Sequence, residues 1–200
     1  MKKFLSICLI LSLFTLVACA GNSQIPDSST AGSSVPEEPA ISIEGDILRM
    51  GNFEIAIPNG FKVTSSSENS ASIAANDGDG CFIGVFAADV SALTEDKIKE
   101  FLPQQATSFS TDNAIRSNES QTDTKFGPLT VTLDLYAETS SDLNATINMD
   151  ASFTDSWYTY TVMFRCYAGS DNISEYSTTF AEFCGYAKYT GKAARFNFVQ

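Results

Sequence analysis

Alternation of apolar and polar residues along positions 129–166 constrains the fold of this chain more than any other feature. From Leu143 to Phe153 every second residue is apolar and the residues between are polar. The stretches 129–135 and 157–166 repeat this period of two. Since successive side chains of a β-strand point to opposite faces, each stretch predicts a strand with one face in the core and one in water. Three such strands in succession predict an antiparallel sheet.

Shorter runs of the same kind occupy the first third of the folded region. Gly51 and Asn52 stand between two of these runs and form a two-residue hairpin signal. The segment 76–80, rich in Gly and Asp, separates another pair, and residues 58–60 form a turn. The expected strands are residues 47–50, 53–57, 61–64, 70–75 and 81–88.

Two segments have the period of a helix instead. Residues 94–109 carry apolar residues at helical spacing, with Thr94 placed to cap the first turn and Pro103 placed to kink the helix. Residues 172–189 carry a second apolar stripe. The stripe residues are Ile173, Tyr176, Phe180, Phe183, Cys184 and Ala187. The order of elements predicts an α+β fold, with an antiparallel β-sheet flanked by helices in an α/β/α sandwich over residues 43–192 and a tail at 193–200.

The first nineteen residues carry an export signal. Lys2 and Lys3 precede an apolar run at 4–17, which is shorter than the roughly 20 residues of a spanning helix. The run ends in Leu-Val-Ala-Cys at 16–19, which resembles the lipobox of bacterial lipoproteins. That resemblance implies a signal peptide at 1–18 and a diacylglycerol, with acyl chains such as palmitate, on Cys19. Ordinary cleavage after Ala20 is the alternative, because Ala-Cys-Ala also satisfies the small-x-small rule.

The segment 19–42 is dominated by Gly, Ser and Pro and has only isolated apolar residues. Such a composition predicts a flexible spacer, although a binding motif at 35–39 is an alternative. A chain tethered at Cys19 would lie at the cell membrane on its extracytoplasmic face, because a diacyl anchor binds membranes firmly.

The opening of the folded region carries a further resemblance. Phe53, Ile55, Ile57, Pro58, Gly60 and Phe61 form the pattern Phe-x-Ile-x-Ile-Pro-x-Gly-Phe. This pattern is similar to the start of PsbP-like domains, a superfamily that includes the photosystem II protein PsbP, the Ran-binding Mog proteins and bacterial lipoproteins of unknown role. The resemblance covers roughly residues 45–190. It implies a non-catalytic domain that acts by binding, and it transfers no functional residue to this chain.

Composition excludes several classes of function. The chain has no histidine, so it holds neither a Ser-His-Asp triad nor a metal site with imidazole ligands. A formal net charge of −12 repels nucleic acid, so no nucleic-acid partner is expected. No glycine-rich phosphate loop is present, and no cofactor is expected. The 24 acidic residues leave one enzymatic alternative, a small cell-envelope hydrolase that uses paired carboxylates.

The turn at 76–80 has part of a calcium-loop pattern. With Gly80 as the glycine of an EF-hand loop, Asp77 and Asp79 stand at ligand positions, but Ala75 and Phe86 occupy two others. The pattern therefore predicts a hairpin tip without a metal site. A weak cation site is the alternative.

Three cysteines follow Cys19, at positions 81, 166 and 184. Cys184 lies on the stripe of the last helix and Cys166 on the apolar face of its strand, so the two would meet if that helix docks on that strand. A Cys166–Cys184 disulfide is therefore one prediction. Buried free thiols are the alternative.

Exposed aromatic and acidic residues supply the candidate binding surface. Trp157 and Tyr189 are the aromatic residues with the strongest expectation of exposure, and Asp77 and Asp79 lie at the hairpin tip. A role for the aromatic residues in the core or as a hairpin staple is the alternative. Together these features predict a lipid-anchored binding or accessory protein, with an envelope protein as its expected partner.

Overall fold

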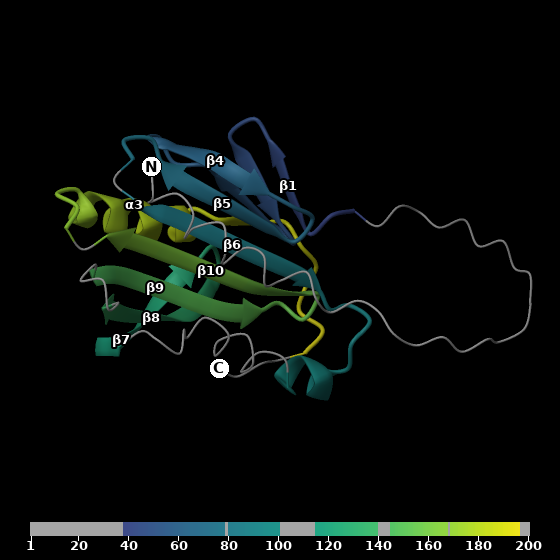
Figure 1. The fold of residues 1–200 in the computed structure, drawn as a ribbon. Helices are drawn as coiled ribbons and strands as arrows, with labels where there is room; N and C mark the ends of the chain where they lie inside the picture. Colours follow the sequence, from purple (N-terminus) through teal and green to yellow (C-terminus); the bar gives the residue numbers. More distant parts are fainter. Residues whose placement is uncertain (1–37, 79, 101–114, 140–144, 168, 197–200) are drawn as a thin grey trace, which may run out of the picture. The chain divides into compact units, whose positions relative to one another are not determined.

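The computed structural model describes residues 38–78, 80–100, 115–139, 145–167 and 169–196 (Figure 1). Several predicted features lie wholly or partly outside these residues: the signal peptide, Cys19, the spacer up to residue 37, Asp79, the first helix beyond residue 100 with its kink at Pro103, and residues 197–200 of the tail. In the described part of the chain, no helix combines the length and the apolar character needed to cross a membrane. The compact unit begins at Glu38 and its first strand at Ile41, two residues before the predicted start at 43.

The described chain consists mostly of strands in two antiparallel sheets, with two helical segments, so the fold is α+β or mostly β. The expectation of one sheet is wrong. The break follows from the turn at 58–60, which separates the short N-terminal hairpins from the longer strands. The four-stranded sheet consists of β1 (Ile41–Glu44), β2 (Ile47–Met50), β3 (Phe53–Ala56) and β11 (Lys188–Tyr189). The seven-stranded sheet has the order β4 (Phe61–Ser66), β5 (Ser70–Ala75), β6 (Phe82–Asp89), β10 (Tyr158–Tyr167), β9 (Ala145–Thr154), β8 (Leu129–Thr139) and β7 (Ile115–Phe126).

The hairpin at Gly51-Asn52 has the predicted register, with Met50 opposite Phe53. Gly51 has a φ of +53°, a conformation that L side chains rarely adopt. A Cβ at this position would also lie 2.7 Å from the hydroxyl oxygen of Tyr160. The positive φ and the lack of room for a Cβ both require glycine at this position. The room is lacking because the turn packs against Tyr160 of β10 in the other sheet. The predicted β5–β6 hairpin is confirmed as well.

The last helix is shorter than predicted. Helix α3 (Ile173–Gly185) ends where the N–H of Tyr186 bonds to Glu182 and that of Ala187 bonds to Cys184. The chain then pairs as β11 with β3, which places Tyr189 opposite Phe53. An apolar residue at 187 fits a helical stripe as well as a strand, so periodicity did not locate the helix end. Residues 95–100 are helical, and the N–H of Ile98 bonds to the carbonyl of Thr94 as the first expected helix requires.

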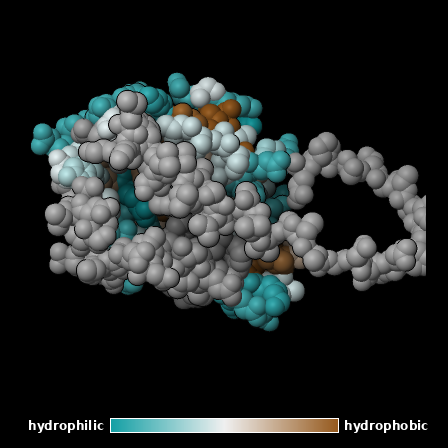
Figure 2. All heavy atoms as spheres, in the orientation of Figure 1, coloured by the Kyte–Doolittle hydropathy of each residue, from teal (hydrophilic) through white to brown (hydrophobic). Residues whose placement is uncertain are grey.

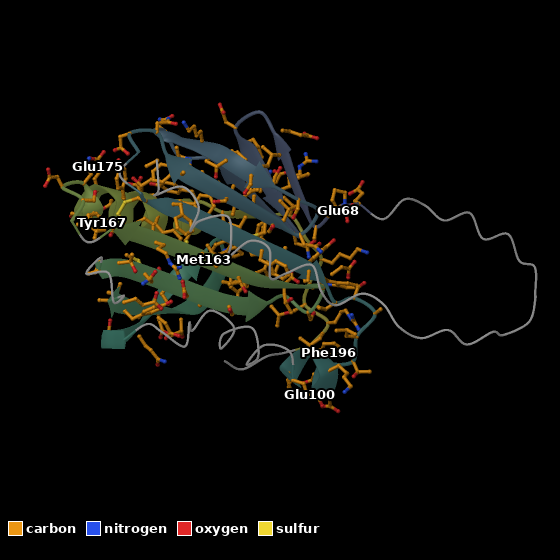
Figure 3. All side chains as sticks on the ribbon, viewed as in Figure 1. Glu68, Glu100, Met163, Tyr167, Glu175 and Phe196 are labelled. Carbon is orange, nitrogen blue, oxygen red and sulfur yellow. A yellow bond between two sulfur atoms is a disulfide. The ribbon has the colours of Figure 1, made fainter. Side chains whose placement is uncertain are left out.

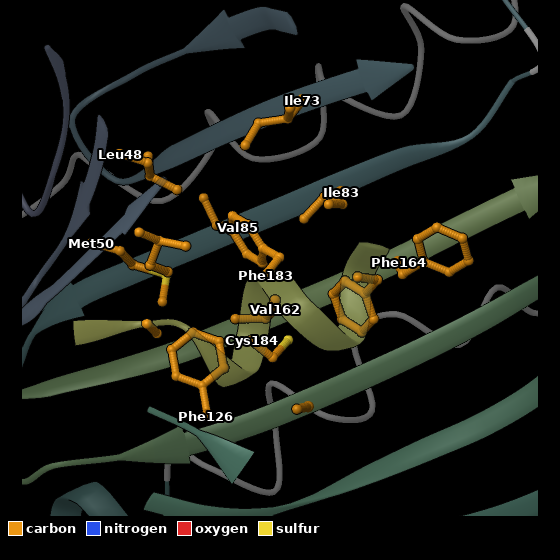
Figure 4. Packing of buried hydrophobic residues seen from close by; sticks show 14 of the residues in the cluster. Leu48, Met50, Ile73, Ile83, Val85, Phe126, Val162, Phe164, Phe183 and Cys184 are labelled. Atoms are coloured by element: carbon orange, nitrogen blue, oxygen red, sulfur yellow. The ribbon is translucent and has the colours of Figure 1, made fainter. Parts of the chain in front are cut away.

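Aromatic residues join the two sheets to α3 in one core. Phe53 is fully buried, and its ring centroid lies 4.9 Å from that of Phe126 and 5.3 Å from that of Tyr160. Phe164 of β10 stacks on Phe180 of α3 at 5.4 Å. Figure 4 shows part of this core, including Phe126, Val162, Phe164 and Phe183. The apolar faces predicted from the period of two are therefore the core faces.

The opposite face is exposed along the first part of β8, at Thr130, Thr132 and Asp134, as expected for a solvated face. On β9 and β10 part of it is buried, which corrects the expectation there. Asn148 of β9 and Thr159 of β10 have no exposed surface, and Thr161 is buried. Alternation in a sequence reports the polarity of the two faces and not their exposure. Hydrophilic residues do cover much of the described surface seen in Figure 2.

The predicted Cys166–Cys184 disulfide is wrong, because Cys166 bonds to Cys81. Arg165 of β10 is opposite Phe82 of β6, so the neighbouring cysteines face each other across the two strands with Cα atoms 4.0 Å apart. Cys184 is a buried free thiol, and burial raises its pKa to about 12.

The direction of α3 explains why Cys184 does not reach Cys166. The helix follows β10 directly and returns along it, so Phe180 lies level with Phe164. Cys184 lies one helical turn beyond Phe180, and Cys166 lies two residues in the opposite direction along β10. These displacements add to roughly 13 Å along the strand.

Candidate functional site

A row of polar side chains crosses the buried polar face of the seven-stranded sheet. Asn148 of β9 is opposite Tyr136 of β8 on one side and Arg165 of β10 on the other. Glu138 of β8 is opposite Thr146 of β9 in the adjacent row. Because residues two apart in a strand share a face, these five side chains lie together. We call them the polar row.

Hydrogen bonds link the members of the polar row. Arg165 Nε donates to Asn148 Oδ1 at 2.6 Å, and Asn148 Nδ2 donates to Thr146 Oγ1 at 3.2 Å. Arg165 Nη2 lies 3.9 Å from Glu138 Oε2. The Tyr136 hydroxyl donates to Asp150 Oδ2 at 2.5 Å. The guanidinium is thus held between the amide of Asn148 and the carboxylate of Glu138.

One acceptor in the polar row has no partner among the residues that the structure describes. The side chain of Glu138 is only 10% exposed, and its Oε1 atom is buried without a hydrogen bond. A buried polar atom left unpaired costs about 1–3 kcal/mol. Arg165, whose side chain is 23% exposed, offers donors beside it. A ligand that accepts a hydrogen bond from Arg165 could also donate one to Glu138 if its donor entered the sheet face, because Oε1 itself has almost no exposed surface.

The polar row does not reproduce a known catalytic arrangement. Asp150, which accepts from Tyr136, lies four residues along β9 from Thr146, so its backbone is roughly 13 Å along the strand from the position of Glu138. Glycosidase carboxyl groups lie roughly 5–10 Å apart. Within the described ranges, no group of three or more His, Cys, Asp or Glu side chains could hold a metal ion.

The structure separates the predicted binding residues into two places. Asp77 accepts a hydrogen bond from the hydroxyl of Tyr176 near the start of α3. Tyr189 lies beyond the other end of this helix, and the part of the helix from Tyr176 to Gly185 alone spans roughly 14 Å along its axis. Asp77 therefore shares no surface with Trp157 and Tyr189. Asp79 lies outside the described residues.

Trp157 and Tyr189 both contact the C-terminal segment, as a hairpin staple would. The indole N–H of Trp157 donates to the carbonyl of Ala193 at 3.1 Å, and the Tyr189 hydroxyl donates to that of Lys192 at 2.6 Å. Lys192 Nζ and Arg195 Cζ lie 5.3 and 5.2 Å from the centroid of the Trp157 ring. Residues 193–196 of the predicted tail are therefore bound to the domain.

Asp155 organises this end of the molecule, and sequence analysis missed its role. It is almost fully buried, and its Oδ1 accepts the N–H groups of Trp157 and Tyr158 at 2.9 and 2.8 Å. Its Oδ2 accepts from Asn52 Nδ2 at 2.7 Å and from the Tyr160 hydroxyl at 2.8 Å. The sequence indicates a turn at Asp155-Ser156, but it does not indicate that Asp155 is buried, because a turn residue is ordinarily exposed.

The same carboxylate affects two tyrosines. Burial, with the negative charge of Asp155 second, raises the pKa of Tyr160 well above its ordinary value. The same two causes raise the pKa of Tyr189 to about 12. Both phenols therefore stay protonated at neutral pH, and the Tyr160 hydroxyl donates a hydrogen bond to Asp155.

Comparison with known proteins identifies neighbours in fold only. No family model and no curated protein matches the sequence. A crystal structure from Bacteroides thetaiotaomicron VPI-5482 matches with a TM-score of 0.48 and 11% identity, over 71% of this chain and 46% of that one. The chain thus spans less than half of that protein. A mutant form of the protein Mog1 matches with a TM-score of 0.40 and 11% identity, over 66% of this chain and 85% of that one.

Proposed function

We propose that this chain is a bacterial lipoprotein whose PsbP-like domain is a non-catalytic binding or accessory module. In this proposal Cys19 carries the lipid, and the domain works on the extracytoplasmic face of the cell membrane with an envelope protein as partner. We also propose that helices flank the sheet in an α/β/α arrangement, because the opening motif resembles the start of PsbP-like domains.

The Cys81–Cys166 disulfide supports the extracytoplasmic location. It joins residues 85 positions apart through neighbouring strands of the larger sheet. Disulfides of this structural kind form and persist in oxidising compartments and are rare in the bacterial cytoplasm. The export signal at the N-terminus agrees with such a compartment.

The Oε1 atom of Glu138, which has no hydrogen-bond partner among the described residues, is the observation that carries the binding role. Burying a carboxylate oxygen without a partner lowers stability, so a purely structural sheet face gains nothing from it. A ligand that donates to this oxygen and accepts from Arg165 would satisfy both groups. A carboxamide or a peptide group of a partner has this chemistry.

The anchor is tested by comparing Cys19→Ser with Cys8→Ser, a matched change inside the leader. We expect wild type and Cys8→Ser in the membrane fraction, with a mature N-terminus at Cys19 whose mass includes the acyl chains. We expect Cys19→Ser to lose this mass and leave the membrane fraction. A wild-type chain that begins at Gly21 without lipid, as cleavage after Ala20 would produce, contradicts the anchor.

The binding role is tested with Glu138→Gln and the matched change Asp134→Asn, an exposed acid four residues earlier on the same face of β8. Crosslinking of the anchored chain in its own cells, followed by mass spectrometry, measures partner capture. We expect Glu138→Gln to reduce capture of a recurring envelope protein by roughly 10–100-fold, as loss of one charged hydrogen bond predicts, and to change stability by less than about 1 kcal/mol. Equal capture by wild type and Glu138→Gln, or equal loss in Asp134→Asn, contradicts this role.

A further inference from the structure

The described domain begins at the same end of the molecule as Trp157. The carbonyl of Ala40 accepts the N–H of Gly51 at 2.7 Å. The adjacent Asn52 donates through its side chain to Asp155, whose carboxylate also accepts the N–H of Trp157. A continuous set of hydrogen bonds therefore joins the point where the chain leaves toward Cys19 to the hairpin that carries Trp157.

Three apolar or aromatic side chains and two basic ones lie together at this end. Leu93 is 37% exposed, and Trp157 and Phe196 are half-buried. The guanidinium of Arg195 binds the carbonyl oxygens of Ser91 and Leu93 and lies 4.8 Å from the ring of Phe196. Figure 3 shows Glu68 and Phe196 at this end and Tyr167 and Glu175 at the opposite end. We call Leu93, Trp157, Lys192, Arg195 and Phe196 the tether-end cluster.

The length of chain before the domain limits its distance from the anchor. Glu38 follows Cys19 by 19 residues. If the spacer is flexible, as its composition predicts, its root-mean-square length is roughly 25 Å. A short flexible link of this kind maintains an effective concentration in the mM range at the surface to which it is attached. A contact with a dissociation constant of about 1 mM would then be formed roughly half of the time.

We propose that the tether-end cluster rests on the lipid bilayer that holds the anchor. Tryptophan prefers the membrane–water interface, and long basic side chains extend from there to lipid phosphates. Leu93 and the edge of the Trp157 ring enter the headgroup zone, and Lys192 and Arg195 lie at the level of the phosphates. This inference depends on lipidation of Cys19, as proposed above.

Charge does not drive this contact. Glu68 and Asp89 lie at the same end as the basic side chains, so the surface as a whole is not cationic. The apolar and aromatic groups therefore provide the attraction, and a zwitterionic bilayer is sufficient. This distinguishes the contact from binding to anionic lipids, which acts through an excess of Lys and Arg.

Trp157 is the only tryptophan of the chain and reports the contact directly. The lipidated chain is inserted into phosphatidylcholine vesicles in which part of the lipid is brominated near the headgroup, a quencher of indole fluorescence. We expect Trp157 to lose roughly half of its emission when the chain is anchored, and to keep it in the Cys19→Ser chain at the same concentration. Leu93→Ser should reduce the quenching, whereas Ile47→Ser, at an equally exposed leucine-sized residue on β2, should leave it unchanged.

A probe at the opposite end completes the test. The double variant Trp157→Phe, Tyr167→Trp places the only indole on the exposed part of β10. We expect no quenching there, with circular dichroism showing that the fold is kept. Chains that float with the vesicles while Trp157 is unquenched, or while both probes are quenched equally, overturn the contact but leave the anchor intact. Wild-type chains that neither float nor carry acyl chains overturn both proposals.

Discussion

Replacing both Cys81 and Cys166 with alanine should lower the free energy of unfolding by roughly 4–5 kcal/mol. The disulfide closes a loop of 85 residues, which includes the whole segment between β6 and the end of β10. A crosslink over such a long loop removes much of the conformational entropy of the unfolded chain. A loss of this size is a large part of the stability of a typical domain.

Urea unfolding with and without a reductant measures this effect. We expect the reductant to destabilise the wild type by about as much as the double replacement, and to have no further effect on the double variant. Cys184→Ala is the matched control, because Cys184 is buried but unpaired. This variant should keep its sensitivity to the reductant. Insensitivity of the wild type would contradict the Cys81–Cys166 pairing.

Asp155→Ala should have the second-largest effect, a loss of about 3–5 kcal/mol. The change leaves the hydroxyl of Tyr160, the amide of Asn52 and two backbone N–H groups without their acceptor. Each buried donor left unpaired costs about 1–3 kcal/mol, and part of this cost is relieved where water reaches the site. The total is therefore smaller than the sum of four separate losses.

Denaturant unfolding of a graded pair of variants tests this role. Asp155→Asn keeps an acceptor for the backbone N–H groups but places an amide donor against the donor of Asn52, so we expect a smaller loss than for alanine. The matched control is Asp134→Ala, which removes an exposed acid and should change stability by less than about 0.5 kcal/mol. Similar stability of Asp155→Ala and Asp134→Ala would show that the hydrogen bonds of Asp155 contribute little.

These two predictions concern opposite ends of β10. The disulfide secures Cys166 at one end, and Asp155 organises the hairpin at the other, where the C-terminal segment and the start of the domain meet. The long central strand is therefore held at both ends. In the proposed lipoprotein this arrangement presents the tether-end cluster on a rigid support.

Particular residues show how far sequence analysis could predict the candidate site. Tyr136, Asn148 and Arg165 belong to strands whose alternation was recognised for residues 129–135, 143–153 and 157–166. Their meeting in one row depends on the register between strands, which no period within a single strand contains. The burial of Glu138 depends on what covers the sheet, and alternation does not report this.

The sequence by itself determined the local elements of this protein. Alternation located β8, β9 and β10, Gly51-Asn52 located a hairpin, and helical spacing located the body of α3, because these signals depend on neighbours a few residues away. The 12-residue strand β7 was not predicted. Only the tertiary structure decided that the strands form two sheets, that Cys81 rather than Cys184 bonds to Cys166, and that Asp155 is a buried acceptor. Each of these depends on residues far apart in the chain, such as Asn52 and Asp155, which are brought together by the packing of one sheet on the other.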